Sequence, residues 1–257
     1  MKSLLVLGAN GAQGGAVARR LTAKGYQVRG FGRATGDLGS ASDVRRAFDG
    51  VTHASVVLPM VHEEKIVTGY VDNVIDAARR AGVERLVFNA NTTIPKEPTS
   101  LPAFETRRAA QEAFLSSGVP TVVLRPPAYL ENLLMPGLLD GNAVSYPLPP
   151  DVPVSWLAQA DLAAATEVAL TAPGLEGMAL DLGGPAALTG PELAAALGVG
   201  SYRPLPLEVF ESAVGTAIAD IYRYLATEEG RQVYAPVTHP VLGINLTNVS
   251  EWMETRR

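Results

Sequence analysis

The chain contains no cysteine among its 257 residues. Disulfide bonds, thiolate catalysis and cysteine-ligated zinc are therefore excluded, and the composition is compatible with the cytosol. The three histidines, His53, His62 and His239, are scattered and form no metal-ligand motif. No apolar run approaches the ~18 residues that a membrane-spanning helix needs. These absences predict a cytoplasmic protein with no membrane association and no metal centre.

Positive charge is also scarce, because 21 lysines and arginines stand against 26 acidic residues and leave a net charge of −5. Direct binding to nucleic acid is therefore disfavoured. Only four of the basic residues are lysines, and none of them lies four residues after a tyrosine. The Tyr-x-x-x-Lys pair, in which lysine lowers the tyrosine pKa so that a proton can be passed at neutral pH, is absent. No G-x-S-x-G or P-loop motif is present either.

A glycine-rich turn follows a short apolar stretch at residues 3–7. Its glycines, Gly8, Gly11 and Gly14, are spaced as G-x-x-G-x-x-G and lead into a helical pattern at residues 16–21. Gly8 permits a tight turn, Gly11 lets the backbone approach phosphates, and Gly14 lets the helix pack close to the strand. The first-turn N–H groups of such a helix have no partners within it and favour an anion. The stretch predicts a dinucleotide site, against the alternative of a purely structural turn.

The end of the second predicted strand indicates which dinucleotide is bound. An NAD site usually has Asp or Glu there, to bond the ribose hydroxyls. This chain has Gly30-Phe31-Gly32-Arg33, and the planar guanidinium of Arg33 suits the 2′-phosphate of NADP. Arg29 is a weaker candidate, and a solvated loop position is the alternative for Arg33. Asp37 lies beyond the arginine and is expected to open the next turn. NADP(H) is therefore the preferred cofactor, with NAD(H) as the alternative.

Strand and helix patterns alternate along the first two thirds of the chain. Strands are predicted at 27–31, 54–58, 85–89, 121–125 and 179–182, and helices at 42–48, 63–81, 104–117 and 159–171. This rhythm predicts an α/β fold with a doubly wound parallel sheet. The stretch 126–153 is rich in proline and shows no clear period. After residue 183 the chain is predicted to be mostly helical, with helices at 191–197 and 207–229.

The change of pattern divides one compact unit, residues 1–257, into two parts. Residues 1–125 and 159–183 form the predicted dinucleotide-binding part. Residues 126–158 and 184–257 form a smaller lobe for a substrate or protein partner. Open α/β sheets bind ligands at the carboxyl ends of their strands, so we expect the smaller lobe to lie over those ends.

Several motifs together resemble the NmrA-like family of atypical short-chain dehydrogenase/reductase proteins. The phosphate loop of that family is similar to G-A-N-G-A-Q-G-G at residues 8–15, which includes Gln13. Its G-D-L element, which follows a third strand, is similar to residues 36–38. Further resemblances are N-V-I-D-A-A at 73–78, G-V-E-R-L-V-F at 82–88, L-R-P-P-A-Y-L-E-N-L-L at 124–134, A-D-L-A at 160–163 and G-G-P at 183–185. The resemblance implies an NAD(P)-binding Rossmann fold with a small C-terminal lobe.

Two departures from the family pattern bear on function. The segment 32–37 is very short, so a helix seen in relatives is expected to be absent, and the loop that carries Arg33 is displaced. Family reductases often carry lysine in an F-x-x-K element. The matching stretch here is Phe104-Glu105-Thr106-Arg107, so Arg107 stands where lysine is expected. Guanidinium holds its proton at any working pH. Arg107 can therefore clamp a cofactor phosphate, polarise a carbonyl or stabilise an oxyanion.

The predicted site combines these motifs. The catalytic candidates are Arg107 and Tyr129, which lines the nicotinamide or substrate pocket or else plugs the space between lobes. Asn91 bonds the nicotinamide side or is an ordinary strand-end residue, and His62 is a proton donor or a loop histidine. The predicted cofactor contacts are Gly8, Asn10, Gly11, Ala12, Gln13, Gly14, Arg33, Asp37, Leu58, Asn91 and Arg107.

Two functions fit this site. The first is an NADPH-dependent reductase of a quinone-like or other small carbonyl compound, because the cofactor supplies the hydride and the protein mainly holds the rings in line. The second is a catalytically inactive NADP(H)-sensing regulator that binds a protein partner. The missing Tyr-x-x-x-Lys pair and the arginine at position 107 support the second. We expect the first, the reductase, and keep the regulator as the alternative.

Overall fold

The computed structural model describes residues 2–256, and within them a six-stranded sheet has the order β2-β1-β3-β4-β5-β7. The four pairings among β2, β1, β3, β4 and β5 are all parallel. The strands of this sheet are β1 (Ser3–Leu7), β2 (Gln27–Phe31), β3 (His53–Val57), β4 (Arg85–Asn89), β5 (Thr121–Arg125) and β7 (Ala179–Asp181). The fold is therefore the doubly wound α/β fold that the alternating pattern predicts.

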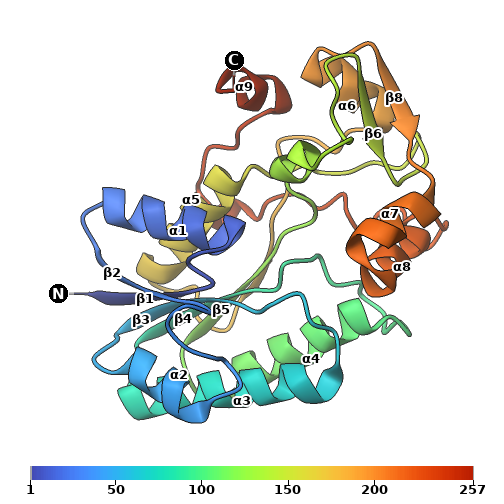
Figure 1. The fold of residues 1–257 in the computed structure, drawn as a ribbon. Coiled ribbons are helices and arrows are strands. Elements are labelled where there is room, and N and C mark those ends of the chain that lie inside the picture. Colours follow the sequence, from blue (N-terminus) through green and yellow to red (C-terminus); the bar gives the residue numbers. More distant parts are fainter. Residues whose placement is uncertain (1, 257) are drawn as a thin grey trace. The chain divides into compact units, whose positions relative to one another are not determined.

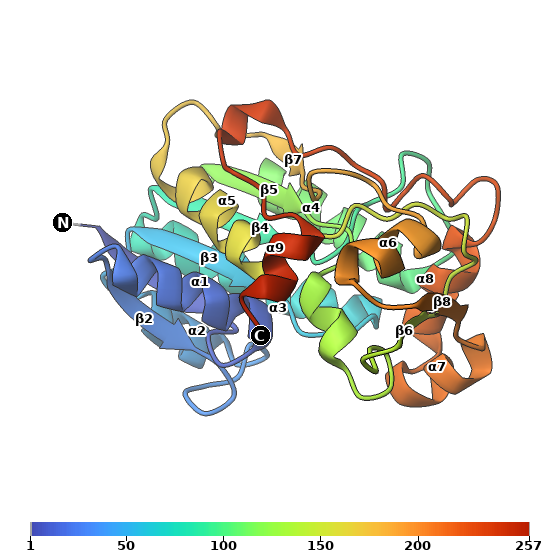
Figure 2. The same cartoon turned by 90° about the horizontal axis from the view of Figure 1, so that it is seen from above.

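Helices cover both faces of the sheet, as Figure 1 shows: α1 (Ala12–Ala23) and α5 (Gln159–Thr171) lie on one face. The other face is covered by α2 (Ala41–Phe48), α3 (Glu64–Ala81) and α4 (Pro102–Ser116). Seen from above, α1 and α5 lie side by side (Figure 2), and Arg20 Nε donates to Glu167 Oε2 across 2.6 Å. Because both faces are covered, β1, β3, β4 and β5 are almost entirely buried.

The apolar stripe of α3 shows why these helices form where they do. Its buried residues recur every three to four positions, which is the spacing of one helical face. The helix ends at Gly82, which adopts the left-handed conformation with φ 66°. On α4, Phe114 packs against Phe88 of β4 with ring centroids 4.8 Å apart. The periodic burial of α3 and the glycine at its end therefore explain where this helix forms and where it stops.

The strand order reverses between β1 and β3, because the chain leaves β1 toward β2 on one side and returns to β3 on the other. In parallel sheets of this kind, ligands bind beyond the carboxyl ends of the strands at such a point. The segments that leave those ends are 8–11 after β1, 58–63 after β3 and 90–91 after β4. The candidate site is built from these segments.

The chain divides into two compact units. Unit 1 comprises 1–91, 105–125 and 162–180, and it contains the sheet just described. Unit 2 comprises 92–104, 126–161 and 181–257. Within its described residues lies a second, two-stranded parallel sheet, β6 (Ala143–Tyr146) with β8 (Ser201–Pro204). The remaining elements of unit 2 are η1 (Leu130–Leu134), α6 (Gly190–Leu197), α7 (Leu207–Val214), α8 (Thr216–Leu225), η2 (Pro240–Leu242) and α9 (Val249–Glu254).

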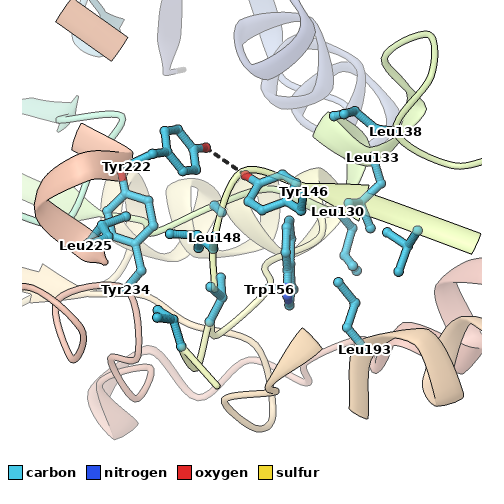
Figure 3. Packing of buried hydrophobic residues seen from close by; sticks show 14 of the residues in the cluster. Leu130, Leu133, Leu138, Tyr146, Leu148, Trp156, Leu193, Tyr222, Leu225 and Tyr234 are labelled. Atoms are coloured by element: carbon cyan, nitrogen blue, oxygen red, sulfur yellow. Dashed lines mark hydrogen bonds between the residues drawn. The ribbon is translucent and has the colours of Figure 1, made fainter. Parts of the chain in front are cut away.

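An aromatic cluster forms the core of unit 2 (Figure 3). Tyr146 packs edge-on against Trp156 at a centroid distance of 4.8 Å and against Tyr222 at 5.5 Å. The Tyr146 and Tyr222 hydroxyls share a hydrogen bond of 2.7 Å, which keeps these buried polar atoms paired. Burial raises the pKa of both hydroxyls above the ordinary value, so they are neutral. The cluster is a packed core built from β6, α8 and the 152–156 segment.

The structure corrects three expectations from the sequence. The predicted helix 207–229 is two helices, because Gly215 adopts φ 85° and ψ 161°, and α8 already ends at Leu225. The stretch 126–153 contains η1 and β6, and the region after residue 183, which was predicted to be mostly helical, also contains the strand β8. No strand precedes the G-D-L element within residues 32–40, which form only turns. Among residues 2–256, no helix is both long enough and apolar enough to cross a bilayer.

Candidate dinucleotide site

The glycine turn after β1 is held against the end of β2. Gly8 adopts φ 73°, which favours glycine, and its N–H donates to Phe31 O at 2.8 Å. A Cβ on Gly8 would lie 2.7 Å from Val57 Cγ1 of β3. A Cβ on Gly14 would lie 2.3 Å from Gly8 O, so the first turn of α1 sits directly on the loop. The backbone can make this close approach only because both positions lack a side chain.

The start of α1 presents open hydrogen-bond donors. Gly11 occupies the N-cap position and has no side chain to cap the helix. Within the described part of the chain, no acceptor pairs with the N–H groups of Ala12, Gln13 and Gly14. No acidic side chain lies in the first turn. Three unpaired donors and the positive end of the helix dipole form a cradle that fits a diphosphate.

A side-chain network connects this cradle to the end of β4. The Gln13 amide donates to Asn91 Oδ1 and accepts from Asn89 Nδ2 at 3.0 Å. Asn91 N in turn donates to Asn89 Oδ1 at 2.8 Å, and Asn91 Nδ2 donates to Met60 Sδ at 2.9 Å. Asn91 has φ 59° and is the single non-glycine residue with positive φ among residues 2–256. An asparagine held in this unusual conformation by side-chain hydrogen bonds makes this edge a candidate binding site.

Arg29 on β2 and Arg33 just after it are the residues that the sequence predicts to distinguish NADP from NAD. Arg33 is exposed, and the described residues offer its side chain no hydrogen bond or ion pair. Arg29 instead donates to Ala47 O at 2.9 Å and Asp49 O at 2.8 Å, at the end of α2. Asp37 accepts from Gly39 N at 2.9 Å, which closes the turn expected there. Arg29 is thus occupied structurally, whereas the Arg33 guanidinium is available to a ligand.

Two other predicted contacts flank the cradle. Asn10 lies against the turn after β2, where a Cβ on Gly32 would be 3.5 Å from Asn10 Nδ2. Leu58 follows β3 and is 4% exposed, so its side chain belongs to the core beneath the edge. Only the backbone of Leu58 can contact a ligand, because its side chain is buried.

Arg107 of α4 is buried beneath the segment that follows β3. It is 2% exposed, and its Nη2 donates to Pro59 O at 2.7 Å and to Val61 O at 3.4 Å. Nη1 is also buried and has no hydrogen-bond partner within residues 2–256. Burial lowers the pKa of Arg107 to about 10, which leaves the group charged at neutral pH. The guanidinium therefore anchors the 59–61 backbone and keeps one donor unused.

His62 lies next to this arginine. Both of its ring nitrogens are buried, and neither has a hydrogen-bond partner in the described residues. Burial, with a smaller contribution from the positive charge of Arg107, lowers the pKa of His62 to about 4. The imidazole is therefore neutral at pH 7 and carries one N–H that it can donate.

The remaining catalytic candidate, Tyr129, belongs to unit 2. It precedes η1, is 3% exposed and forms a parallel bridge with Leu157. Sequence reasoning did not single out Asn89 or Met60. Asn89 is a buried polar residue at the end of β4, two positions before Asn91, and that position is the signal that identifies it. Met60 has no such signal, since its contact with Asn91 is purely tertiary.

The parallel sheet, its reversal point and the open cradle define an NAD(P)-binding α/β protein of the Rossmann type. Neither histidine nor acidic residues gather into a metal-binding group in the part of the chain that the structure describes. The chain belongs to the NmrA-like family, whose model matches residues 1–224.

Two curated relatives and one solved structure illustrate the family. An NAD(P)H azoreductase from Xenophilus azovorans is 32% identical over 194 residues, 74% of this chain and 64% of the azoreductase. The chain thus spans slightly less than two thirds of that relative. A (4-alkanoyl-5-oxo-2,5-dihydrofuran-3-yl)methyl phosphate reductase from Streptomyces griseus is 34% identical over 222 residues, 80% of this chain and 76% of the reductase. The crystal structure of an NADPH-dependent quinone oxidoreductase from Escherichia coli has a TM-score of 0.70 at 22% identity and covers 98% of this chain and 99% of its own, which shows a shared fold.

Proposed function

We propose that the protein is an NADPH-dependent reductase of small, electron-poor conjugated acceptors such as quinones or azo compounds. The observation that carries this proposal is the cradle of three unpaired N–H groups at α1, connected through Gln13 to Asn91 at the end of β4. The named activities of the relatives support the substrate class. An azo bond, an unsaturated furanone and a quinone all accept hydride into a conjugated system.

Arg33 supports the choice of NADPH over NADH. Its guanidinium follows β2, where the ribose of a bound dinucleotide lies, and neither aspartate nor glutamate occurs among residues 27–33 to bond the ribose hydroxyls. A planar, charged donor pair matches a phosphate with two hydrogen bonds. We assign Arg33 to the 2′-phosphate of the cofactor.

Four residues of the chain have roles in the proposed reaction. When bound, NADPH supplies the hydride. Gln13 and Asn91 orient the cofactor at the strand ends, because their amides are already fixed by hydrogen bonds. The unused Nη1 donor of Arg107 and the neutral His62 can stabilise negative charge on the acceptor. Arg107 does not give up its proton at neutral pH, so the reduced acceptor takes its proton from water.

A second candidate is a regulator that binds NADP(H) and a protein partner without turnover. One observation favours it: Arg107 donates two hydrogen bonds to the backbone carbonyls of Pro59 and Val61. A residue used to fasten the backbone is less free to act on a substrate. In this alternative the same cradle binds the cofactor, but no acceptor is reduced.

The test is NADPH oxidation, followed by absorbance, against a panel of quinones and azo dyes, with dinucleotide affinity measured by calorimetry. We expect turnover well above background. Arg33→Gln should weaken NADPH binding about 10-fold to 100-fold, the equivalent of losing a charge-assisted contact, and leave NADH binding unchanged. Arg46→Gln, which removes one charge from the surface of α2, is the matched control. Tight NADPH binding without turnover would favour the regulator over the reductase, and no binding of either dinucleotide would refute both functions.

A further inference from the structure

Met60 is the central residue of a three-residue turn that leaves β3. Val61 N donates to Pro59 O at 2.8 Å, which closes the turn around it. Arg107, which is buried beneath the turn, donates from Nη2 to the carbonyls of Pro59 and Val61. The backbone on both sides of Met60 is therefore fixed, whereas the residue itself is 58% exposed. Among residues 2–256 it is the most exposed methionine.

The sulfur of Met60 belongs to the hydrogen-bond network that reaches the cradle, and every member of this network lies in unit 1. Its Sδ accepts from Asn91 Nδ2 at 2.9 Å. The oxygen of the same amide, Asn91 Oδ1, accepts from the Gln13 amide in the first turn of α1. Asn89 supports both residues, because its Oδ1 accepts from Asn91 N at 2.8 Å and its Nδ2 donates to Gln13 Oε1 at 3.0 Å. A change at Met60 therefore acts on Asn91 first and through it on Gln13.

The chemistry of an exposed thioether makes this contact sensitive to oxidants, because peroxides convert methionine to its sulfoxide. A lone pair of Sδ attacks one oxygen of hydrogen peroxide, the O–O bond breaks and an S–O bond forms. The second oxygen leaves as water with both protons, so the sulfur loses two electrons and the peroxide gains them. The new oxygen atom does not fit into the 2.9 Å between Sδ and Asn91 Nδ2. The sulfoxide must therefore break this hydrogen bond or displace the Asn91 amide.

We propose that Met60 is a redox modification site, at which oxidation by a peroxide releases Asn91 and lowers the affinity of the cradle for its dinucleotide. The inference rests on the dinucleotide site of the proposed function. In the reduced protein the Asn91 and Gln13 amides are held by hydrogen bonds, so a dinucleotide binds without having to order them. Asn91 also keeps φ 59°, a conformation that persists only where its surroundings impose it, and oxidation removes one of these restraints. The change is reversible, because methionine sulfoxide reductases restore the thioether.

The test compares the wild type, Met60→Leu and Met135→Leu before and after treatment with hydrogen peroxide. Met135 is the matched control, because it is 40% exposed and lies at the end of η1 in unit 2. Peptide mass spectrometry measures the sulfoxide at each methionine, and calorimetry measures the dissociation constant for NADPH. The oxidised wild type and oxidised Met135→Leu should bind NADPH about threefold to tenfold more weakly than before treatment, the effect of one lost hydrogen bond. Untreated Met60→Leu should already show the weaker affinity, and peroxide should not change it further.

The side-chain amide of Asn91 provides a second readout that does not depend on the cofactor. Its proton and nitrogen resonances should shift when Met60 is oxidised, and a methionine sulfoxide reductase should restore both the resonances and the affinity for NADPH. An unchanged dissociation constant with Met60 fully oxidised would overturn the proposal, and so would an equal loss of affinity in peroxide-treated Met60→Leu. If the untreated wild type binds no dinucleotide, the proposed function has failed. Asn91 resonances that do not move on oxidation would refute the effect of Met60 separately.

Discussion

His62 predicts a specific loss of stability in acid. Its pKa is lowered from 6.5 to about 4 by burial and, to a smaller extent, by Arg107. The folded protein therefore resists binding a proton that the unfolded chain accepts readily below pH 6.5. Above that pH both states carry a neutral imidazole and this group contributes no pH dependence. As the pH falls through the window from 6.5 to 4, the unfolded state is favoured progressively.

The size of the effect follows from the two pKa values. A difference of one pKa unit is worth about 1.4 kcal/mol of free energy. At each pH, the loss of folding stability follows from how much more fully the imidazole is protonated in the unfolded chain than in the folded protein. His62 should reduce the free energy of unfolding by about 1.4 kcal/mol at pH 5.5 and by about 2.5 kcal/mol at pH 4.5. These losses are a substantial part of the 5–15 kcal/mol that is typical of a folded protein.

The assay compares urea unfolding of the wild type with that of His62→Gln at pH 7.5, 5.5 and 4.5, followed by circular dichroism. Carboxylates and the buried His53, whose pKa is also lowered by burial, contribute equally to both proteins and cancel in the difference. The variant should therefore gain about 1.4 and about 2.5 kcal/mol relative to the wild type at the two lower pH values, measured against pH 7.5. His239→Gln changes an exposed histidine and is the matched control.

Parallel pH profiles of wild type and His62→Gln would refute the reasoning. They would mean that water or a moving side chain solvates the imidazole in the folded protein. The buried, unpaired state of its ring nitrogens would then be wrong, and with it the neutral donor assigned to His62 beside Arg107. A profile that diverges in the opposite direction would mean that the folded state binds the proton more tightly.

Two further predictions concern the cradle. Gly14→Ala places a Cβ 2.3 Å from Gly8 O, so it should abolish measurable NADPH binding in calorimetry and cost about 1–3 kcal/mol in urea unfolding. Gly69→Ala, where nothing lies within 4 Å, should instead stabilise α3 by about 0.5–1 kcal/mol, and equal effects of the two changes would contradict the close-packing argument. At Asn91, Ala should destabilise the protein by about 1–2 kcal/mol more than Gly, because only glycine relieves φ 59°, and both should raise the KM for NADPH. Equal stabilities of the two Asn91 variants would show that the backbone there carries no strain.

Local patterns were sufficient to predict the sheet and its helices. The strands at 27–31, 85–89 and 121–125 and the helix at 159–171 have the predicted bounds. Two of these strands, 85–89 and 121–125, are short buried runs, which is a pattern that sequence shows directly. Unit 2 was harder, since β6 and β8 are each four residues long and pair across more than fifty residues of sequence. Such strands carry no period of their own. The break at Gly215 was missed because the apolar stripe continues on both sides of it.

The candidate site likewise has one part that the sequence predicts and another that it does not. The glycine turn is encoded within seven residues, so its geometry can be predicted from spacing alone. The contacts of Arg107 depend on the backbone of Pro59 and Val61, which no pattern around position 107 reveals. The same holds for Met60 and Asn91, which lie far apart in the sequence and meet only in the fold. The sequence identified candidate residues, but only the tertiary structure shows which groups each of them contacts.

In the proposed reductase function, the arginine at position 107 would narrow the range of acceptors that the site can reduce. A planar guanidinium can bond two backbone carbonyls and still keep a donor, whereas an ammonium group is a single compact charge. Fixing the 59–61 segment and offering one N–H are therefore compatible roles for the same buried side chain. Because the group stays protonated, it can lower the energy of a developing anion but cannot supply its proton. Acceptors whose reduced form is a stable anion, as a quinone's is, fit this constraint better than simple ketones, whose alkoxide needs a proton at once.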